Sequence, residues 1–269
     1  MYETKYIFRY CSSKLRDMNQ TIETMLAHRS IRNFTDEAVS PEDLQLILDA
    51  AMHAATSRFL HHADLIWVKD KTKKAELAKV ANQAYIADAA ELFIAIVDTR
   101  RNARILQEKG LDAAAAAAPT AFREGFTDAI LLTQTLAIAA ESLGYGSTLL
   151  GSVLNDYAKT IEILGLPKYT FPALGVMIGK PAVQPQLKPR IPTNLRIMVD
   201  AYQEPDSWSE ALRDFDQEIQ TYYDTRTINR REDAFTTQVV SKLGSYPEKS
   251  EFFTAAAAQG FHVFESEAV

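Results

Sequence analysis

The sequence has a single cysteine, Cys11, among its 269 residues. One cysteine excludes a disulfide framework within the chain, and it also excludes a metal site built from several thiolates. Such sparse cysteine usage is typical of proteins in a reducing compartment. We therefore expect the chain to be cytoplasmic.

The chain also lacks an excess of positive charge and any long apolar run. Its formal net charge is −6, whereas a general nucleic-acid binder gathers lysine and arginine on one face. No run of about eighteen apolar residues is present to cross a membrane, and the first residues lack the apolar core of a secretory signal. A hydrophobic share of 47% and a charged share of 24% predict a globular protein. Because of the net charge and the lack of a long apolar run, we expect neither nucleic-acid nor membrane partners.

Several motifs that would identify an enzyme class are missing. The chain has no P-loop, no zinc-binding HExxH and no esterase GxSxG pattern. Gly144-Tyr145-Gly146 could be mistaken for a dinucleotide fingerprint, but it follows a predicted helix rather than a strand. Leu149 stands where the third glycine belongs, so a Rossmann site is not expected.

Three of the histidines lie close together in the sequence, at His53, His61 and His62. No carboxylate accompanies them at ligand spacing. We therefore expect exposed or helix-capping histidines and no metal site.

Hydrophobic periodicity predicts more helices than strands. The short strands are separated by helices, which indicates an α/β or α+β fold with a central sheet between helices. The apolar run over 92–97 is continuous, as in a strand buried on both faces. Helices are expected over 22–27, 41–52, 71–80, 100–117, 121–143, 156–164, 207–224 and in two C-terminal segments, and strands over 65–68, 92–97 and 171–179.

The domain organisation is expected to be simple. Residues 1–17 follow no periodic pattern, whereas Met18 precedes a clear helix start. We expect 1–17 to be a loosely packed extension and 18–269 to be one domain, because no segment is long or polar enough to be a linker. The helix over 121–143 is apolar on most sides, which is typical of a helix that is central or lies in a subunit interface.

The segment His28-Arg29-Ser30-Ile31-Arg32 concentrates positive charge in an otherwise acidic protein. Arginine offers a planar fork of donors suited to carboxylate or phosphate. Alone, such a run is more often a solvated basic turn. With a second cationic group nearby in the fold, it would favour a bound phosphate.

Lys188 and Arg190 form a second cationic pair, with prolines beside them that keep the chain extended. In extended chain, positions i and i+2 point to one face, so both cations could reach a single anion. A third group, Arg226, Arg230 and Arg231, is by itself more often a solvated loop.

Gln83, which follows Asn82, precedes the predicted strand over 92–97. An amide side chain both donates and accepts hydrogen bonds, which suits a ring with imide-like edges. The alternative from these residues alone is an ordinary surface turn.

In their order and spacing these motifs resemble the nitroreductase family, in its NADPH-dependent oxygen-insensitive nitroreductase and flavin reductase branch. The resemblance covers about 18–245. The residues that carry it are His28 to Phe34, Ala54 to Leu60, Gln83-Ala84-Tyr85, Gly144-Tyr145-Gly146, Leu150-Gly151, Phe171-Pro172, Gly175, Gly179-Lys180-Pro181, Lys188 to Pro192, Tyr222 to Arg226 and Asn229-Arg230-Arg231.

The resemblance implies an α+β sandwich with a central, mostly antiparallel sheet flanked by helices, forming an intertwined homodimer that binds FMN at the subunit interface. It also assigns roles along the cofactor. Arg29, Ser30 and Arg32, with His28 beside them and with Lys188 and Arg190, would hold the phosphate and ribityl chain. Thr56, Ser57 and Gln83 would address the isoalloxazine ring, and Leu150 and Gly151 would lie near its reactive nitrogen.

The implied activity is hydride transfer from NADPH or NADH through FMN to nitroaromatics, quinones or free flavin, with ping-pong kinetics. No catalytic side chain is implied, because flavin and solvent can supply protons. Arg226, Arg230 and Arg231 are candidates for NADPH binding. Other readings stay open: a reductase of another acceptor, such as a halogenated aromatic or an enone, or a flavin-binding or phosphate-ligand sensor or storage protein without turnover. Ser152 and Leu154 depart from the family pattern beside the expected ring site.

Overall fold

The computed structural model describes residues 19–224, 233–246 and 251–263. The chain divides into two compact units. The larger unit comprises Thr24–Pro185 and Lys249–Val269, and the smaller unit comprises Met1–Glu23 and Gln186–Glu248. Each unit is described by itself, and the expectation of one domain over 18–269 stays a prediction. The expected extension over 1–17 lies outside the described residues.

A four-stranded sheet forms the centre of the larger unit, and every neighbouring pair of strands is antiparallel. The expected central, mostly antiparallel sheet is confirmed. In spatial order its strands are β1 (Ala63–Trp67), β2 (Glu91–Asp98), β4 (Thr170–Gly179) and β3 (Gly146–Leu150). β3 is therefore an edge strand, with one side open to pair with another segment.

The two central strands are buried on both faces, as the apolar run over 92–97 predicted. In β2, Leu92, Ile94 and Ile96 point into one core cluster, while Phe93 points into another on the opposite face. This alternation follows from the two-residue period of a strand. It explains why β2 needs an unbroken apolar sequence.

A proline lies within central strand β4 without disrupting the sheet. Pro172 pairs with Ile96, and the register of β2 against β4 shifts between Ala95 and Ile96. A proline has no N–H to give to a neighbouring strand, so within sheets it is tolerated at such irregularities.

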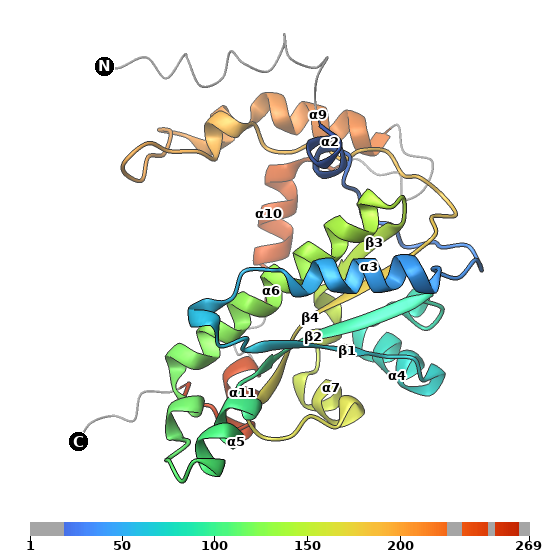
Figure 1. Ribbon diagram of the computed structural model, residues 1–269. Helices are drawn as coiled ribbons and strands as arrows, with labels where there is room; N and C mark the ends of the chain where they lie inside the picture. Colours follow the sequence, from blue (N-terminus) through green and yellow to red (C-terminus); the bar gives the residue numbers. More distant parts are fainter. Residues whose placement is uncertain (1–18, 225–232, 247–250, 264–269) are drawn as a thin grey trace. The chain divides into compact units, whose positions relative to one another are not determined.

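Helices cover both faces of the sheet (Figure 1). On one face α3 (Pro41–Met52) and α6 (Pro119–Ser142) pack together, with Ile47 and Leu136 fully buried. On the other face lie α4 (Lys71–Ala81) and α7 (Tyr157–Leu164). The expected layering of helices around a central sheet is confirmed.

Local sequence signals place several helix ends correctly. Ser40 caps α3 by accepting a hydrogen bond from the backbone N–H of Asp43, and Pro41 occupies the first helical turn. Asp70 caps α4 in the same way. Gly165 ends α7 with a φ of 66°, a conformation that glycine adopts without strain.

Two predicted helices are wrong in their extent. Instead of one helix over 100–117, α5 (Arg100–Glu108) ends before Gly110, whose φ is 73°. A separate 3₁₀ turn follows at Ala114–Ala117, where the Asp112 carboxylate accepts from the N–H of Ala114. The alanine-rich sequence favours helix, but the glycine and this local side-chain bond interrupt it.

The predicted helix over 207–224 is divided at Leu212 into α8 (Trp208–Ala211) and α9 (Arg213–Asp224). Leu212 is buried in the core of the smaller unit, beside Phe215 and Ile219. The remaining helices are α2 (Gln20–Leu26), α10 (Phe235–Leu243) and α11 (Phe252–Ala258). Among the described residues, no helix has the length and apolar character needed to span a membrane.

Candidate functional site

The basic segment is docked along the open edge of β3. Ser30 forms a parallel bridge with Ser147, and the N–H of Ile31 donates to the carbonyl oxygen of Ser147 at 2.8 Å. The Thr148 hydroxyl donates in turn to the carbonyl oxygen of Ile31. The segment is therefore an ordered addition to the sheet and not a solvated turn.

Gly146 makes this docking possible. A Cβ atom at Gly146 would lie 2.6 Å from Cγ1 of Ile31, whose side chain is 4% exposed. No side chain fits in so short a distance. The Gly-Tyr-Gly sequence thus has a structural role: Gly144, with a φ of 85°, follows the end of α6, and Gly146 admits the basic segment.

His28 is held by a carboxylate from α6. Its Nδ1 lies 2.8 Å from Oε1 of Glu141, and the Ser147 hydroxyl donates to the same oxygen at 2.5 Å. Glu141 thus ties the basic segment, β3 and α6 together. This arrangement fits the expected place of His28 beside the cation cluster.

Arg29 and Arg32 carry charge that no acid neutralises in the part of the chain that the structure describes. The Arg29 guanidinium is half-buried and donates only to backbone carbonyls, from Nε to Ala27 at 2.9 Å and from Nη1 to Pro185 at 3.2 Å. Arg32 is exposed. An arginine fixed in place without a carboxylate suits an external anion.

The other end of β3 leads to a second group of predicted residues. Leu150 is 2% exposed and packs in the core, so only its backbone can meet a ligand. Gly151 is exposed, and a Cβ there would meet nothing within 4 Å. Open space thus lies beside Gly151. Gly151 follows Ser147 by four residues of extended chain, which span roughly 13 Å.

Gln83 lies at this same end of β3. Its Oε1 accepts from the Ser152 hydroxyl at 2.9 Å and from the Tyr85 hydroxyl at 2.5 Å. The structure therefore brings together Gln83 and the segment that begins at Gly151. With its oxygen occupied by two donors, the amide presents its N–H groups to whatever lies outside.

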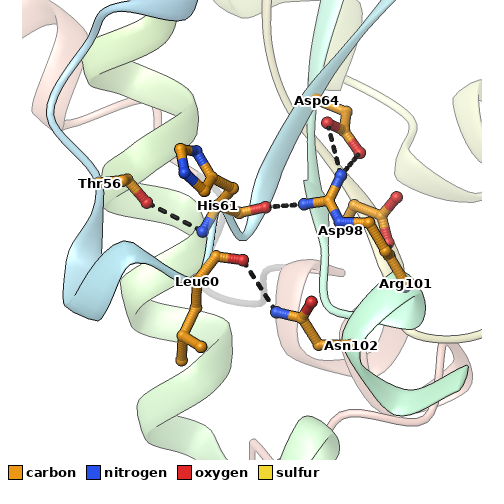
Figure 2. A network of polar contacts seen from close by, with 7 residues as sticks. All are labelled: Thr56, Leu60, His61, Asp64, Asp98, Arg101 and Asn102. Atoms are coloured by element: carbon orange, nitrogen blue, oxygen red, sulfur yellow. Dashed lines mark hydrogen bonds and ion pairs between the residues drawn. The ribbon is translucent and has the colours of Figure 1, made fainter. Parts of the chain in front are cut away.

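Thr56 and Ser57 are fixed to α6 by one buried carboxylate. Asp128, 3% exposed, accepts from the Thr56 hydroxyl at 2.7 Å and from the N–H of Ser57 at 2.9 Å. The Thr56 oxygen also accepts from the N–H of His61 (Figure 2). These bonds fix the loop, and those of the Thr56 hydroxyl explain why a short hydroxyl residue stands at that position.

Lys188 and Arg190 belong to the smaller unit. Nη1 of Arg190 donates to the carbonyl oxygen of Lys188 at 2.7 Å, and Nζ of Lys188 lies 5.5 Å from the ring centroid of Tyr223. Their meeting with Arg29 at one phosphate stays a prediction. Arg226, Arg230 and Arg231, expected to bind NADPH, lie outside the described residues.

The sequence reasoning missed the three acids of α6, namely Glu124, Asp128 and Glu141. Glu124 is 7% exposed and Asp128 is 3% exposed. Their signal was present: carboxylates within a nearly apolar helix are rarely buried unless they have partners. Each of the three holds a group from another segment.

The expectation for the histidines was wrong at His62. His53 does cap α3 and His61 is exposed, but His62 is only 4% exposed and caps no helix. Burial lowers the pKa of His62, an effect that the negative charges of Asp128 and Glu124 oppose. β1 begins at the next residue, Ala63, and His62 packs against Gly125 of α6. This packing buries the ring.

Comparison with known proteins supports the resemblance. The model of the nitroreductase family matches residues 25–180, and that of its C-terminal domain matches 188–263. An NADPH-flavin oxidoreductase of Vibrio harveyi is 36% identical over 231 residues, which cover 84% of this chain and 92% of that protein. An oxygen-insensitive NADPH nitroreductase of Salmonella typhimurium is 33% identical over 223 residues, which cover 82% and 90%.

A solved structure agrees with the sequence comparison. The Vibrio harveyi NADPH:FMN oxidoreductase, in complex with NAD⁺, has a TM-score of 0.80 and 32% identity. The match covers 90% of this chain and 99% of that chain.

Proposed function

Because the chain belongs to the nitroreductase family, we propose that it is an FMN-dependent oxidoreductase that uses NADPH or NADH to reduce nitroaromatics, quinones or free flavin. Bound FMN supplies the redox chemistry, and the protein supplies binding, orientation and electrostatics. The relatives named NADPH-flavin oxidoreductase and NADPH nitroreductase support this reading.

The observation that carries the proposal is the charge of Arg29 and Arg32, which no acid of the described residues pairs, on a segment fixed to β3. A phosphate monoester carries about −1.5 to −2 charge near neutral pH, so it complements two to four cations. Arg29, Ser30 and Arg32 hold the phosphate in this proposal, joined by Lys188 and Arg190. His28 stands beside them.

The residues at the far end of β3 suit a flat ring. Gly151 leaves open space where a side chain would obstruct it. Gln83 presents amide N–H donors, which match carbonyl or ring-nitrogen acceptors on the polar edge of a flavin. Thr56 and Ser57 complete the ring contacts in this proposal, held in place by Asp128.

The proposal also includes an oligomeric state and a cellular location. Exposed apolar side chains on α3 and α6, such as Leu46, Met52, Ile130 and Leu131, support a homodimer that buries them. Light scattering coupled to gel filtration tests this. The single Cys11 supports a cytoplasmic location.

The test is a visible spectrum of the purified protein followed by turnover. We expect a flavin spectrum that is bleached by NADPH without oxygen and restored by a quinone or nitroaromatic. Steady-state rates should give parallel double-reciprocal lines, because donor and acceptor use one site in turn. A yellow protein that does not oxidise NADPH faster with any acceptor would instead be a flavin-binding protein without turnover. A colourless protein that ignores added FMN would refute the proposal.

A comparison of several electron acceptors also identifies the class of compound that the enzyme reduces fastest. A halogenated aromatic or an enone reduced faster than quinones and nitroaromatics would assign another acceptor to the same scaffold.

A further inference from the structure

A cavity lies in the larger unit. Its volume is about 590 Å³, within the range of roughly 300–1,000 Å³ typical of small-molecule sites. It is bordered by the loop over 58–62, by α5 and by the start of α6. Much of its wall is alanine, at Ala115, Ala116, Ala118 and Ala121.

The loop that forms one wall is held in a costly conformation. Arg58, Phe59 and His61 all have positive φ, at 52°, 59° and 50°. Residues other than glycine adopt this conformation at a cost, and it persists only where the surroundings impose it. Conformations of this kind gather at ligand sites.

Figure 2 shows what imposes this conformation. The Asn102 amide on α5 donates to the carbonyl oxygen of Leu60 at 2.9 Å. Arg101 donates to the carbonyl oxygen of His61 and pairs with Asp64 at 3.1 Å. The loop is thereby fixed to α5, so the cavity has two rigid walls.

The wall of the cavity includes the Glu124 carboxylate, one oxygen of which can still accept a hydrogen bond. Glu124 is 7% exposed, and its Oε1 is paired with Nε of Arg58 at 3.2 Å and lies 3.9 Å from Arg123. Its Oε2 has no donor within the described ranges. Oε2 is not sealed off from solvent, so it is open to a ligand and can accept a charge-assisted hydrogen bond from a ligand donor.

His62 is a second polar group that lacks a hydrogen-bond partner among the described residues. It also lines the cavity, and its Nδ1 is the buried side-chain atom without a hydrogen-bond partner among the described residues. An unsatisfied buried nitrogen calls for an explanation such as a water or a ligand. Two buried polar groups in one alanine-walled cavity indicate a site built for a molecule.

The chemistry of these groups narrows the ligand class. Small apolar walls suit an apolar body, and Arg58 at the rim favours an aromatic face. The negative charge of Glu124 disfavours anions, and its Oε2 can accept a hydrogen bond from a ligand donor. Nitroaromatics and quinones without a hydroxyl offer acceptors only, so they cannot donate to it.

We propose that this cavity binds uncharged phenolic aromatics, whose hydroxyl donates to Oε2 of Glu124 while the ring lies against the alanine wall. The proposal does not depend on the flavin assignment.

The test is calorimetric titration of the protein, as purified, with 2-naphthol and with 2-methoxynaphthalene, which has the same rings but no donor. We expect 2-naphthol to bind at least about tenfold more tightly, as the loss of a hydrogen bond to a charged group predicts. Equal binding of the two compounds would overturn the proposal, and so would no binding of 2-naphthol.

Variants locate the binding. Glu124→Gln should weaken 2-naphthol at least about tenfold, whereas Glu108→Gln, at an exposed position on α5, should not change it. Ala115→Leu fills the cavity from an exposed position and should also weaken binding, which guards against a folding defect of the first variant. Unchanged affinity in both would overturn the proposal, as would a 2-naphthol-induced change in the flavin absorption band, because that places the ligand on the flavin.

Discussion

The Ser152 hydroxyl donates a 2.9 Å hydrogen bond to the amide oxygen of Gln83, a residue 69 positions earlier in the chain. The Tyr85 hydroxyl donates to the same oxygen at 2.5 Å. Two donors on one oxygen fix the orientation of the amide and leave its N–H groups available for the proposed flavin contact. Ser152, a departure from the family pattern in the sequence, is thus part of this local network.

Replacement of Ser152 by alanine removes one of these donors. We expect Ser152→Ala to raise the FMN dissociation constant by about two- to tenfold, since a neutral hydrogen bond contributes about 0.5–1.5 kcal/mol. Flavin fluorescence during titration of the apoprotein measures this. Ser142→Ala, which removes an exposed hydroxyl bonded to Ala139, is the matched control. An affinity equal to that of the control would show that Ser152 does not orient Gln83 for the flavin.

Removal of the Arg29 guanidinium should weaken FMN binding by about 1–3 kcal/mol, because a charged hydrogen bond to phosphate is lost. Lys188→Ala should have an effect of the same size. Both are measured as FMN retained after dialysis, with Arg104→Ala at an exposed position on α5 as the control. If both variants keep FMN as well as the control does, the phosphate assignment is incorrect.

Two glycines should respond differently to an added methyl group. Gly146→Ala places a Cβ 2.6 Å from Ile31, so we expect a lower melting temperature as the basic segment is displaced. Gly151→Ala meets nothing within 4 Å and should keep its melting temperature without flavin. Gly151→Ala should nevertheless bind FMN less well, because the methyl group enters the proposed ring site. Equal melting temperatures of the two apoproteins would contradict the docking argument.

Asp128→Ala should destabilise the protein by about 1–3 kcal/mol. The substitution leaves the Thr56 hydroxyl and the Ser57 N–H without their acceptor. Urea unfolding of the apoprotein measures the loss, and Asp49→Ala, at an exposed position on α3, is the control. A difference from the control below about 0.5 kcal/mol, the range of ordinary surface substitutions, would show that Asp128 does not hold the loop.

The buried His62 should make stability depend on pH. Burial holds its pKa in the folded state below the ordinary value of 6.5, against the opposing charges of Asp128, Glu124 and Asp98, while Arg101 lowers it further. The unfolded chain therefore binds more protons, so stability falls as pH drops from about 6.5 toward the lowered pKa. His62→Gln should show a smaller loss of unfolding free energy between pH 7.5 and pH 5.5 than the parent protein. An equal loss in both proteins would assign the pH dependence to other groups.

The sequence by itself determined the layers of the fold and most helix boundaries. Continuous apolar runs predicted the buried central strand β2, and local caps such as Ser40 and Gly165 marked helix ends, because these signals act over a few residues. The same local reasoning failed over 100–117, where Gly110 outweighs alanine propensity. The basic segment around Arg29 was also predicted, since a cluster of charged residues is evident from the sequence alone.

Only the tertiary structure decided how these segments meet. It joined the basic segment to β3 through Gly146, and it joined Gln83 to Ser152 across 69 residues. Contacts between distant segments depend on strand order, which periodicity does not encode. The same holds for burial: His62 and Glu124 looked ordinary in sequence, and they became a candidate ligand site because β1 and α6 bring them to one cavity.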